Sequence, residues 1–185
     1  MYLPNLKSIY QVLTWYNTRQ EPGKSVGIFS VLPSNIANQF PKEGKEKEDD
    51  SPPHITICYI GSLPLHYEDK LVEVLKQSCK NIKPFLVSLK KPKKFINNDN
   101  QIVLHSPVAS KKLKNFHYFL KNELLRNLIP VDNKFPEFKP HVTISYCADK
   151  DELARYKNII PEGEWMIDSV WIWGMKNPEL IPLGK

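Results

Sequence analysis

One short motif occurs twice in this chain of 185 residues, and it constrains the fold more than any other feature. Residues 53–59 (PHITICY) and 140–146 (PHVTISY) both read proline, histidine, apolar, threonine, apolar, small residue, tyrosine. The chain has only five histidines and four threonines, so chance predicts about 0.1 pairs in which a threonine follows a histidine by two residues. Two such pairs occur. The repeat therefore predicts two equivalent segments in two halves of one fold.

Each copy reads as a β-strand, in which successive side chains point to opposite faces. Strict alternation places the histidine, the threonine and the small residue of each copy on one face, and the apolar residues and the tyrosine on the other. We expect the second set, including Tyr59 and Tyr146, to face a core. The histidines and threonines then face a cleft, and a pseudo-two-fold axis would let both polar faces converge on one point.

Two imidazoles and two hydroxyls around one point suit phosphodiester chemistry. Histidine titrates near pH 6.5, so one ring can act as a base and the other as an acid at neutral pH. Threonine hydroxyls can donate hydrogen bonds to phosphate oxygens and stabilise the charge of the transition state. No cysteine, histidine or carboxylate spacing typical of a metal site accompanies the motif, so we predict a reaction that uses no metal and no cofactor.

Helical and strand patterns alternate along the chain, which predicts the α/β or α+β class with a sizeable sheet. Helices are predicted over about 4–18, 67–79 and 109–125, with a short one after 149, and strands over 26–32, 54–60, 85–89, 101–105, 141–146 and 165–173. The linker at 90–100 is basic and rich in turn residues, and the charged loop at 42–50 is a candidate lid over the cleft. No segment reads as a linker between independent domains.

Composition says more about the partners and location to expect than about the reaction. The formal charge of +6 favours an anionic partner only mildly, because 23 of the 26 basic residues are lysine and forked phosphate contacts need arginine. No run of 18 apolar residues is present, so we expect no membrane partner. Three cysteines without paired spacing favour a reducing, cytoplasmic location.

The repeated motifs resemble those of the two-histidine (2H) phosphoesterase superfamily, and in particular its 2′-5′ RNA ligase/cyclic phosphodiesterase branch. PPHITICYIGSLP resembles the first motif of that branch, FKPHVTISY resembles the second, and KSVGIFSVLP stands where its opening strand stands. The resemblance covers about residues 24–173. It implies an α+β fold of two pseudo-symmetric lobes, each with an antiparallel-rich sheet and outer helices, around a central cleft. Residues 1–20 then form a flanking helix and 21–185 a single bilobal domain.

The resemblance also implies roles for residues. His54 and His141 become the acid–base pair, and Thr56 and Thr143 position the phosphate. Lys139 stands where many relatives carry an arginine that contacts substrate. Family members act on phosphodiesters beside a ribose 2′-oxygen: terminal 2′,3′-cyclic phosphates, 2′-5′ linkages, or cyclic oligonucleotide signals, the last in bacteriophage anti-CBASS phosphodiesterases. We expect a monomer that acts on an RNA end or a cyclic nucleotide.

Other residues are interpreted from the sequence alone. His66, His105 and His117 lack a threonine partner and are expected to be structural or surface residues. Trp173, on the last predicted strand, could stack on a substrate base. Two alternatives stay open: a non-catalytic module that binds RNA or nucleotides on the same fold, and an interaction protein whose N-terminal helix docks a partner.

Overall fold

The computed structural model describes residues 25–40, 52–97, 100–132, 137–146, 150–160, 162–175 and 177–184. The predicted N-terminal helix and the charged loop at 42–50 lie outside these residues, so the flanking-helix and lid hypotheses stay predictions.

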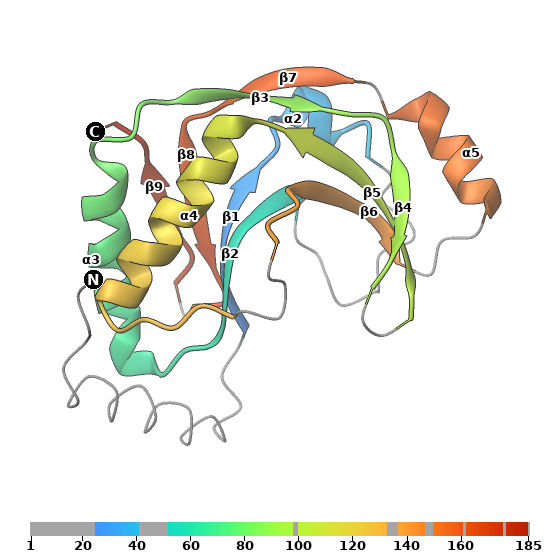
Figure 1. Ribbon diagram of the computed structural model, residues 1–185. Coiled ribbons are helices and arrows are strands. Elements are labelled where there is room, and N and C mark those ends of the chain that lie inside the picture. Colours follow the sequence, from blue (N-terminus) through green and yellow to red (C-terminus); the bar gives the residue numbers. More distant parts are fainter. Residues whose placement is uncertain are drawn as a thin grey trace.

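The described strands form one antiparallel sheet in the order β7-β3-β5-β6-β2-β1-β8-β9, with β4 also paired to β5 (Figure 1). The strands are β1 (Ser25–Val31), β2 (His54–Ser62), β3 (Phe85–Leu89), β4 (Lys93–Ile96), β5 (Ile102–Ala109), β6 (His141–Tyr146), β7 (Gly163–Ile167), β8 (Ser169–Trp173) and β9 (Glu179–Pro182). The two histidine motifs are β2 and β6, which lie side by side in the middle of this order.

The two halves are joined rather than separate. Because β2 pairs with β6 at Ile55 and Val142, the two sheets expected from the sequence merge into one continuous sheet that curls as a half-barrel (Figure 1). Ile55 and Val142 are both completely buried, so the seam between the halves belongs to the hydrophobic core. The α+β class predicted from the sequence is confirmed.

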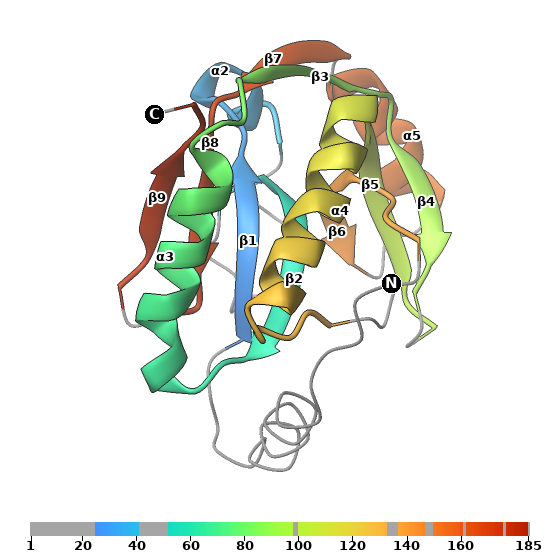
Figure 2. The same ribbon diagram turned by 60° about the vertical axis from the view of Figure 1, so that its left-hand side comes forward.

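Two long helices cover one face of the sheet. The described helices are α2 (Ser34–Ala37), the 3-10 turn η1 (Leu65–Tyr67), α3 (Glu68–Cys79), α4 (Lys111–Arg126) and α5 (Lys150–Ile159). α3 and α4 lie over the same face of β1 and β2 (Figure 2). α4 begins where the Ser110 hydroxyl accepts a hydrogen bond from the Leu113 backbone N–H, and its buried stripe is Leu113, Phe116, Leu120 and Leu124. None of the described helices is both long enough and apolar enough to cross a membrane.

The strand predicted over 165–173 is wrong in one respect. It consists of two strands, β7 and β8, which lie in opposite halves of the sheet. β7 pairs with β3, and β8 pairs with β1. A continuous apolar run in the sequence does not indicate where one strand ends and the next begins. β4 was also missed, because its residues are all exposed at a sheet edge and carry no alternating pattern.

Candidate active site

Both motif strands carry a β-bulge at the same place in the repeat. On β2, Cys58 pairs with Ile28 and Thr56 with Phe29, so Ile57 is the extra residue. On β6, Ser145 pairs with Leu104 and Thr143 with His105, so Ile144 is the extra residue. Each bulge lies three residues after the motif histidine. The two copies of the motif therefore share the position of a β-bulge as well as their sequence.

The bulges reverse the expected placement of the last motif residues. A bulged residue shifts the strand by one position, so every side chain beyond it changes face. Cys58 and Ser145 are buried on the helix side, whereas Tyr59 and Tyr146 are each 38% exposed. The prediction that both tyrosines face the core is thus wrong. They share the open face of the sheet with the histidines and threonines.

The four predicted residues meet on this open face. The pairing of Ile55 with Val142, continued by one residue in each direction, sets His54 opposite Thr143 and Thr56 opposite His141. We call these four residues the histidine–threonine square. The two histidines lie on its diagonal, where backbone positions in adjacent strands are about 7–8 Å apart. The register thus places the two motif histidines on adjacent strands and on the same face of the sheet.

Both histidine rings are held in the same way. Nδ1 of His54 lies 2.8 Å from the Pro52 carbonyl oxygen, and Nδ1 of His141 lies 2.8 Å from the Lys139 carbonyl oxygen. A carbonyl oxygen only accepts, so each Nδ1 carries the hydrogen, and Nε2 is the basic atom of the neutral ring. The shared hydrogen bond, to the residue two positions earlier, follows from the shared motif.

Each motif histidine also contacts an aromatic ring from the strand next to its own motif strand. The Phe29 ring on β1 packs edge-on against His54, with centroids 4.7 Å apart. The His105 ring on β5 packs edge-on against His141 at 5.3 Å, and Phe95 on β4 packs against both of these imidazoles. His105 was expected to be a structural or surface residue. It instead lies directly beside the site.

Burial lowers the pKa of His141 and of its neighbour His105. Removal from water lowers the pKa of His141 below its ordinary value of 6.5, although the Lys139 carbonyl opposes this shift. Burial, followed by the nearby charge of His141, lowers the pKa of His105 to about 4. A hydrogen bond with the Val103 backbone opposes this shift but does not cancel it. Both shifts favour the neutral, basic form of the two rings at pH 7.

His117 on α4 supports the first bulge from the helix side. Its Nδ1 lies 2.6 Å from the carbonyl oxygen of Ile57, the bulged residue, and its ring stacks on Phe138 at 4.0 Å. The neighbouring Cys58 thiol has its pKa raised to about 12 by burial, so it stays a thiol and does not act as a nucleophile. His117 thus connects the bulge of the first motif to the segment that leads into the second.

The two predicted substrate-binding residues lie in different settings. Trp173 is 38% exposed and pairs with Gly27 on β1, on the open face of the sheet. Lys139 is exposed and its ammonium group lies 3.2 Å from the Glu137 carboxylate, so in this structure it pairs with an acidic side chain. A phosphate contact by Lys139 stays a prediction.

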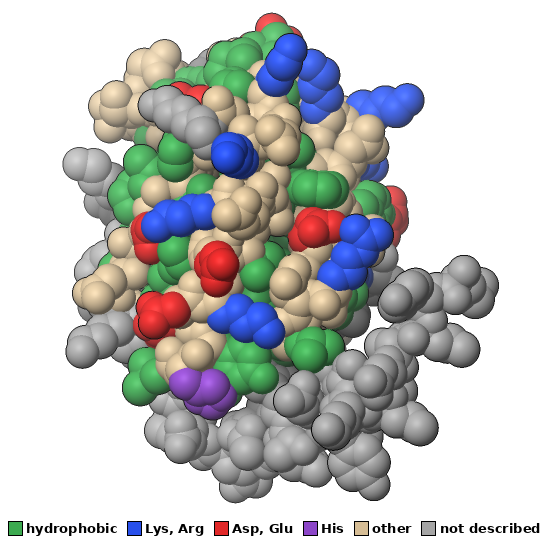
Figure 3. Space-filling view, turned by 90° about the vertical axis from the view of Figure 1, so that its left-hand side faces the viewer, with side chains coloured by type: hydrophobic (Ala, Val, Ile, Leu, Met, Phe, Trp, Pro, Cys, Tyr) green, Lys and Arg blue, Asp and Glu red, His purple; other side chains and the backbone are tan. Residues whose placement is uncertain are grey.

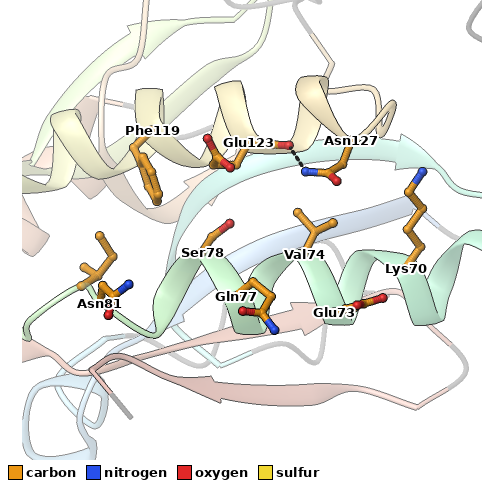
Figure 4. A pocket seen from close by; sticks show the side chains of 10 residues that line it. Lys70, Glu73, Val74, Gln77, Ser78, Asn81, Phe119, Glu123 and Asn127 are labelled. Carbon is orange, nitrogen blue, oxygen red and sulfur yellow. Dashed lines mark hydrogen bonds between the residues drawn. The ribbon is translucent and has the colours of Figure 1, made fainter. Parts of the chain in front are cut away.

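The helix side of the molecule offers a different kind of surface. An open groove of about 540 Å³ lies between α3 and α4, and Figure 4 shows polar side chains such as Lys70, Glu73 and Glu123 along it. None of its lining residues belongs to a motif strand. On the face in Figure 3, basic and acidic side chains are interspersed. The described residues that line this groove therefore do not include the paired histidines and threonines that the predicted chemistry needs.

Comparison with known proteins places this sheet and its paired motifs in a family. The model of the 2′-5′ RNA ligase superfamily matches residues 34–179, and this chain belongs to that superfamily, a branch of the 2H phosphoesterases. No curated protein sequence matches the chain.

Several solved structures share the fold at low sequence identity. TT0787 of Thermus thermophilus has a TM-score of 0.63 at 16% identity, over 86% of this chain and 98% of that one. Escherichia coli LigT complexed with 3′-AMP has a TM-score of 0.57 at 15% identity, over 86% and 95%. Kluyveromyces marxianus Usb1 with uridine monophosphate has a TM-score of 0.51 at 12% identity, over 86% and 98%. At these identities the likeness concerns the fold alone.

Proposed function

We propose that this protein is a metal-independent phosphodiesterase that acts on ribonucleotide phosphodiesters beside a ribose 2′-oxygen. The observation that carries the proposal is the histidine–threonine square, in which two identically anchored imidazoles lie on adjacent strands and on the same face of the sheet. Membership of the superfamily supports the reaction class.

In the proposed reaction, His141 is the general base. Its burial favours the neutral ring at pH 7, so Nε2 can take a proton from a water molecule or a ribose 2′-hydroxyl. The oxygen then attacks phosphorus and forms the new P–O bond. The bond to the ribose leaving oxygen breaks, and the ring of His54, in its protonated form, returns a proton to that oxygen. Two histidines supply both proton transfers, so the scheme needs no metal ion.

Thr56 and Thr143 would stabilise the transition state. Each threonine lies opposite a histidine in the neighbouring strand, so both hydroxyls would reach a phosphate that lies between the two histidines. A hydroxyl that donates to a non-bridging oxygen gains strength as negative charge builds there. This differential gain would raise the rate of the chemical step more than the affinity for substrate.

A nucleotide is the substrate class best supported. The structures of the similar LigT and Usb1 contain 3′-AMP and uridine monophosphate. The aromatic side chains on the open face, among them Trp173 and Tyr59, could contact a base. The candidates are terminal 2′,3′-cyclic phosphates, 2′-5′-linked oligonucleotides and cyclic oligonucleotides.

The direct test is a hydrolysis panel in the presence of EDTA. The panel contains four 2′,3′-cyclic mononucleotides, a 2′-5′-linked and a 3′-5′-linked diadenylate, and cyclic dinucleotides and trinucleotides. We expect at least one substrate with a ribose 2′-oxygen at the scissile phosphate to turn over at the same rate with and without chelator.

Three results would count against the proposal. Activity that EDTA abolishes would contradict the metal-free scheme. Equal cleavage of all linkages would contradict the role of the 2′-oxygen. Binding of nucleotides without turnover across the panel would favour the alternative, a non-catalytic nucleotide-binding module.

A further inference from the structure

Two lysines stand on the open face of the sheet, beyond β5 as seen from the histidine–threonine square. The first is Lys93 on β4, the strand beside β5 (Figure 2). Lys93 pairs with His105, which pairs with Thr143 of the square, and cross-strand partners point to the same face. Phe95, two residues after Lys93 on the same strand, contacts His141. This contact identifies the Lys93 side of β4 as the side of the site.

The second lysine, Lys90, stands at the end of the other row of the square. Its backbone N–H donates a 2.8 Å hydrogen bond to the carbonyl oxygen of Pro107, which continues the pairing of Leu89 with Val108 by one position. Pro107 in turn pairs with His141. Leu89 is buried on the helix side, so Lys90, the next residue, points to the open face. Each row of the square thus ends in a lysine two strands away from β6.

Both ammonium groups are available to a ligand. Lys90 and Lys93 are exposed, and neither forms an ion pair with any of the described residues. Lys139, by contrast, is paired with an acidic side chain. Burial lowers the pKa of His105 to about 4, and the charge of Lys93 adds to this shift, as expected for an ammonium group on the same side of the sheet.

Distance favours a contact beside the scissile phosphate over one with that phosphate itself. Neighbouring strands are about 4.8 Å apart, so β4 lies about 12 Å along the sheet from the midpoint between β6 and β2. A lysine side chain spans about 6 Å and a hydrogen bond about 3 Å. Side chains also stand roughly perpendicular to a sheet, so the ammonium group stays on the β5 side of the square.

On the opposite side of the square, the described partners carry no charge. His54 pairs there with Val31. Thr56 pairs with Phe29, which in turn pairs with Trp171 on β8. The two rows therefore run from apolar and aromatic residues at one end to lysines at the other. A substrate that lies along them has its additional negative charge matched only at the lysine end.

We propose that Lys90 and Lys93 bind a second phosphate of the substrate, the 5′-phosphate of the nucleoside that carries the scissile phosphodiester. This inference rests on the proposed function and narrows it to oligonucleotides, because a 2′,3′-cyclic mononucleotide has no second phosphate. The 5′-phosphate is the neighbour that the remaining candidates share. It is also the nearest other phosphate at an RNA end that carries a 2′,3′-cyclic phosphate.

The experiment compares the binding of adenosine 3′-monophosphate and adenosine 3′,5′-bisphosphate by titration calorimetry in EDTA. The two ligands differ only in the 5′-phosphate. We expect wild type to bind the bisphosphate about 10-fold more tightly, and this preference to fall about 3- to 5-fold in Lys93→Met, the effect of losing one exposed ionic contact. The double variant Lys90→Met/Lys93→Met should lose most of the preference. Lys93→Arg keeps the charge and should keep the preference.

A control variant removes the same charge from other places. Lys94 follows Lys93 on β4 but pairs with the buried Leu104, so its side chain lies on the opposite face. Lys114 is an exposed residue of α4, on the helix side. The double variant Lys94→Met/Lys114→Met therefore has the net charge of Lys90→Met/Lys93→Met and should keep the wild-type preference.

Three results would overturn the lysine site. Wild type binds both nucleotides equally, the control variant loses the preference as well, or Lys93→Met weakens both nucleotides by the same factor. The last result would mean that Lys93 acts on the scissile phosphate or only through the overall charge.

A turnover assay separates this outcome from that of the proposed function. It compares adenosine 2′,3′-cyclic phosphate with the same compound carrying a 5′-phosphate. If wild type cleaves both with equal kcat/KM, the lysine site fails and the proposed function stands. If wild type prefers the bisphosphate in calorimetry but cleaves nothing in the hydrolysis panel, the proposed function fails and the contact with a second phosphate stands.

Discussion

Phe29 and His105 occupy equivalent positions in the two halves of the sheet, and each packs its ring against a motif histidine. Phe29 is the cross-strand partner of Thr56 and contacts His54, while His105 is the partner of Thr143 and contacts His141. The pseudo-symmetry of the site is therefore broken here by one ionisable ring. A difference between the two motif histidines in acid–base behaviour is expected to arise at this position.

The first prediction concerns the burial of His141 by His105. Replacing His105 with alanine admits water to His141 and removes part of the desolvation that lowers its pKa. The base is active when unprotonated, so its pKa sets the acidic limb of the kcat/KM profile. In wild type we expect that limb below pH 6.5. In His105→Ala it should move to higher pH, towards 6.5.

His105→Phe is the matched control, because it copies the Phe29 arrangement and keeps the ring that covers His141. Its acidic limb should stay near the wild-type position. Lys93, which pairs with His105 from β4 and whose charge also lowers the pKa of His105, is kept in every variant. An acidic limb that moves equally in both variants would show that burial by the ring is not the cause.

The second prediction concerns the threonine hydroxyls. Thr56→Val and Thr143→Val keep the β-branched shape and remove one donor each, so kcat should fall by about 10²–10³, the usual effect of losing one such donor, with little change in KM. Thr→Ser at either position keeps the hydroxyl and should retain most of the activity. Steady-state kinetics on the best substrate of the panel decide the matter. A rise in KM with unchanged kcat would place the hydroxyls in substrate binding only.

The third prediction concerns His117. His117→Ala leaves the carbonyl of the bulged Ile57 without its side-chain donor and removes the stacked partner of Phe138. The free energy of unfolding should fall by about 1–3 kcal/mol, the usual cost of an orphaned buried polar group. Urea denaturation measures it. The exposed His66 provides the control, and His66→Ala should change stability by less than about 0.5 kcal/mol.

The fourth prediction concerns Gly27. An alanine Cβ there would overlap the Phe29 ring, so Gly27→Ala should destabilise the protein by about 1–3 kcal/mol and disturb the contact between Phe29 and His54. Gly163 on β7 is the matched control, since a Cβ there meets its nearest atom at 3.9 Å. Gly163→Ala should be neutral or slightly stabilising. Equal thermal shifts in the two variants would mean that Phe29 does not lie over Gly27.

The sequence was sufficient to predict the motif strands and the residues of the square. A histidine and a threonine two positions apart share a face of any regular strand, and the repeat supplied the second copy. The buried apolar face of α4 and the buried strand β1 could likewise be predicted from the spacing of apolar residues in the sequence. These features depend on local spacing, which a sequence displays directly.

Features that depend on irregular backbone or on distant pairing could not be predicted. Ile57 and Ile144 are ordinary strand residues, so nothing in the sequence marks the bulges that carry Tyr59 and Tyr146 to the open face. His105 lacks a motif of its own, and only the pairing of β5 with β6 brings it to His141.

The central claim is that His54 and His141 act together on one phosphodiester, and a double-mutant cycle tests it most directly. kcat is measured in EDTA for wild type, His54→Ala, His141→Ala and the double variant, with phosphate affinity as the check on folding. We predict that each single variant loses at least about 10²–10⁴-fold in kcat, that phosphate still binds, and that the double variant loses little more than either single one, because the two rings serve one reaction. Full activity in either single variant, or losses that multiply in the double variant, would contradict the account.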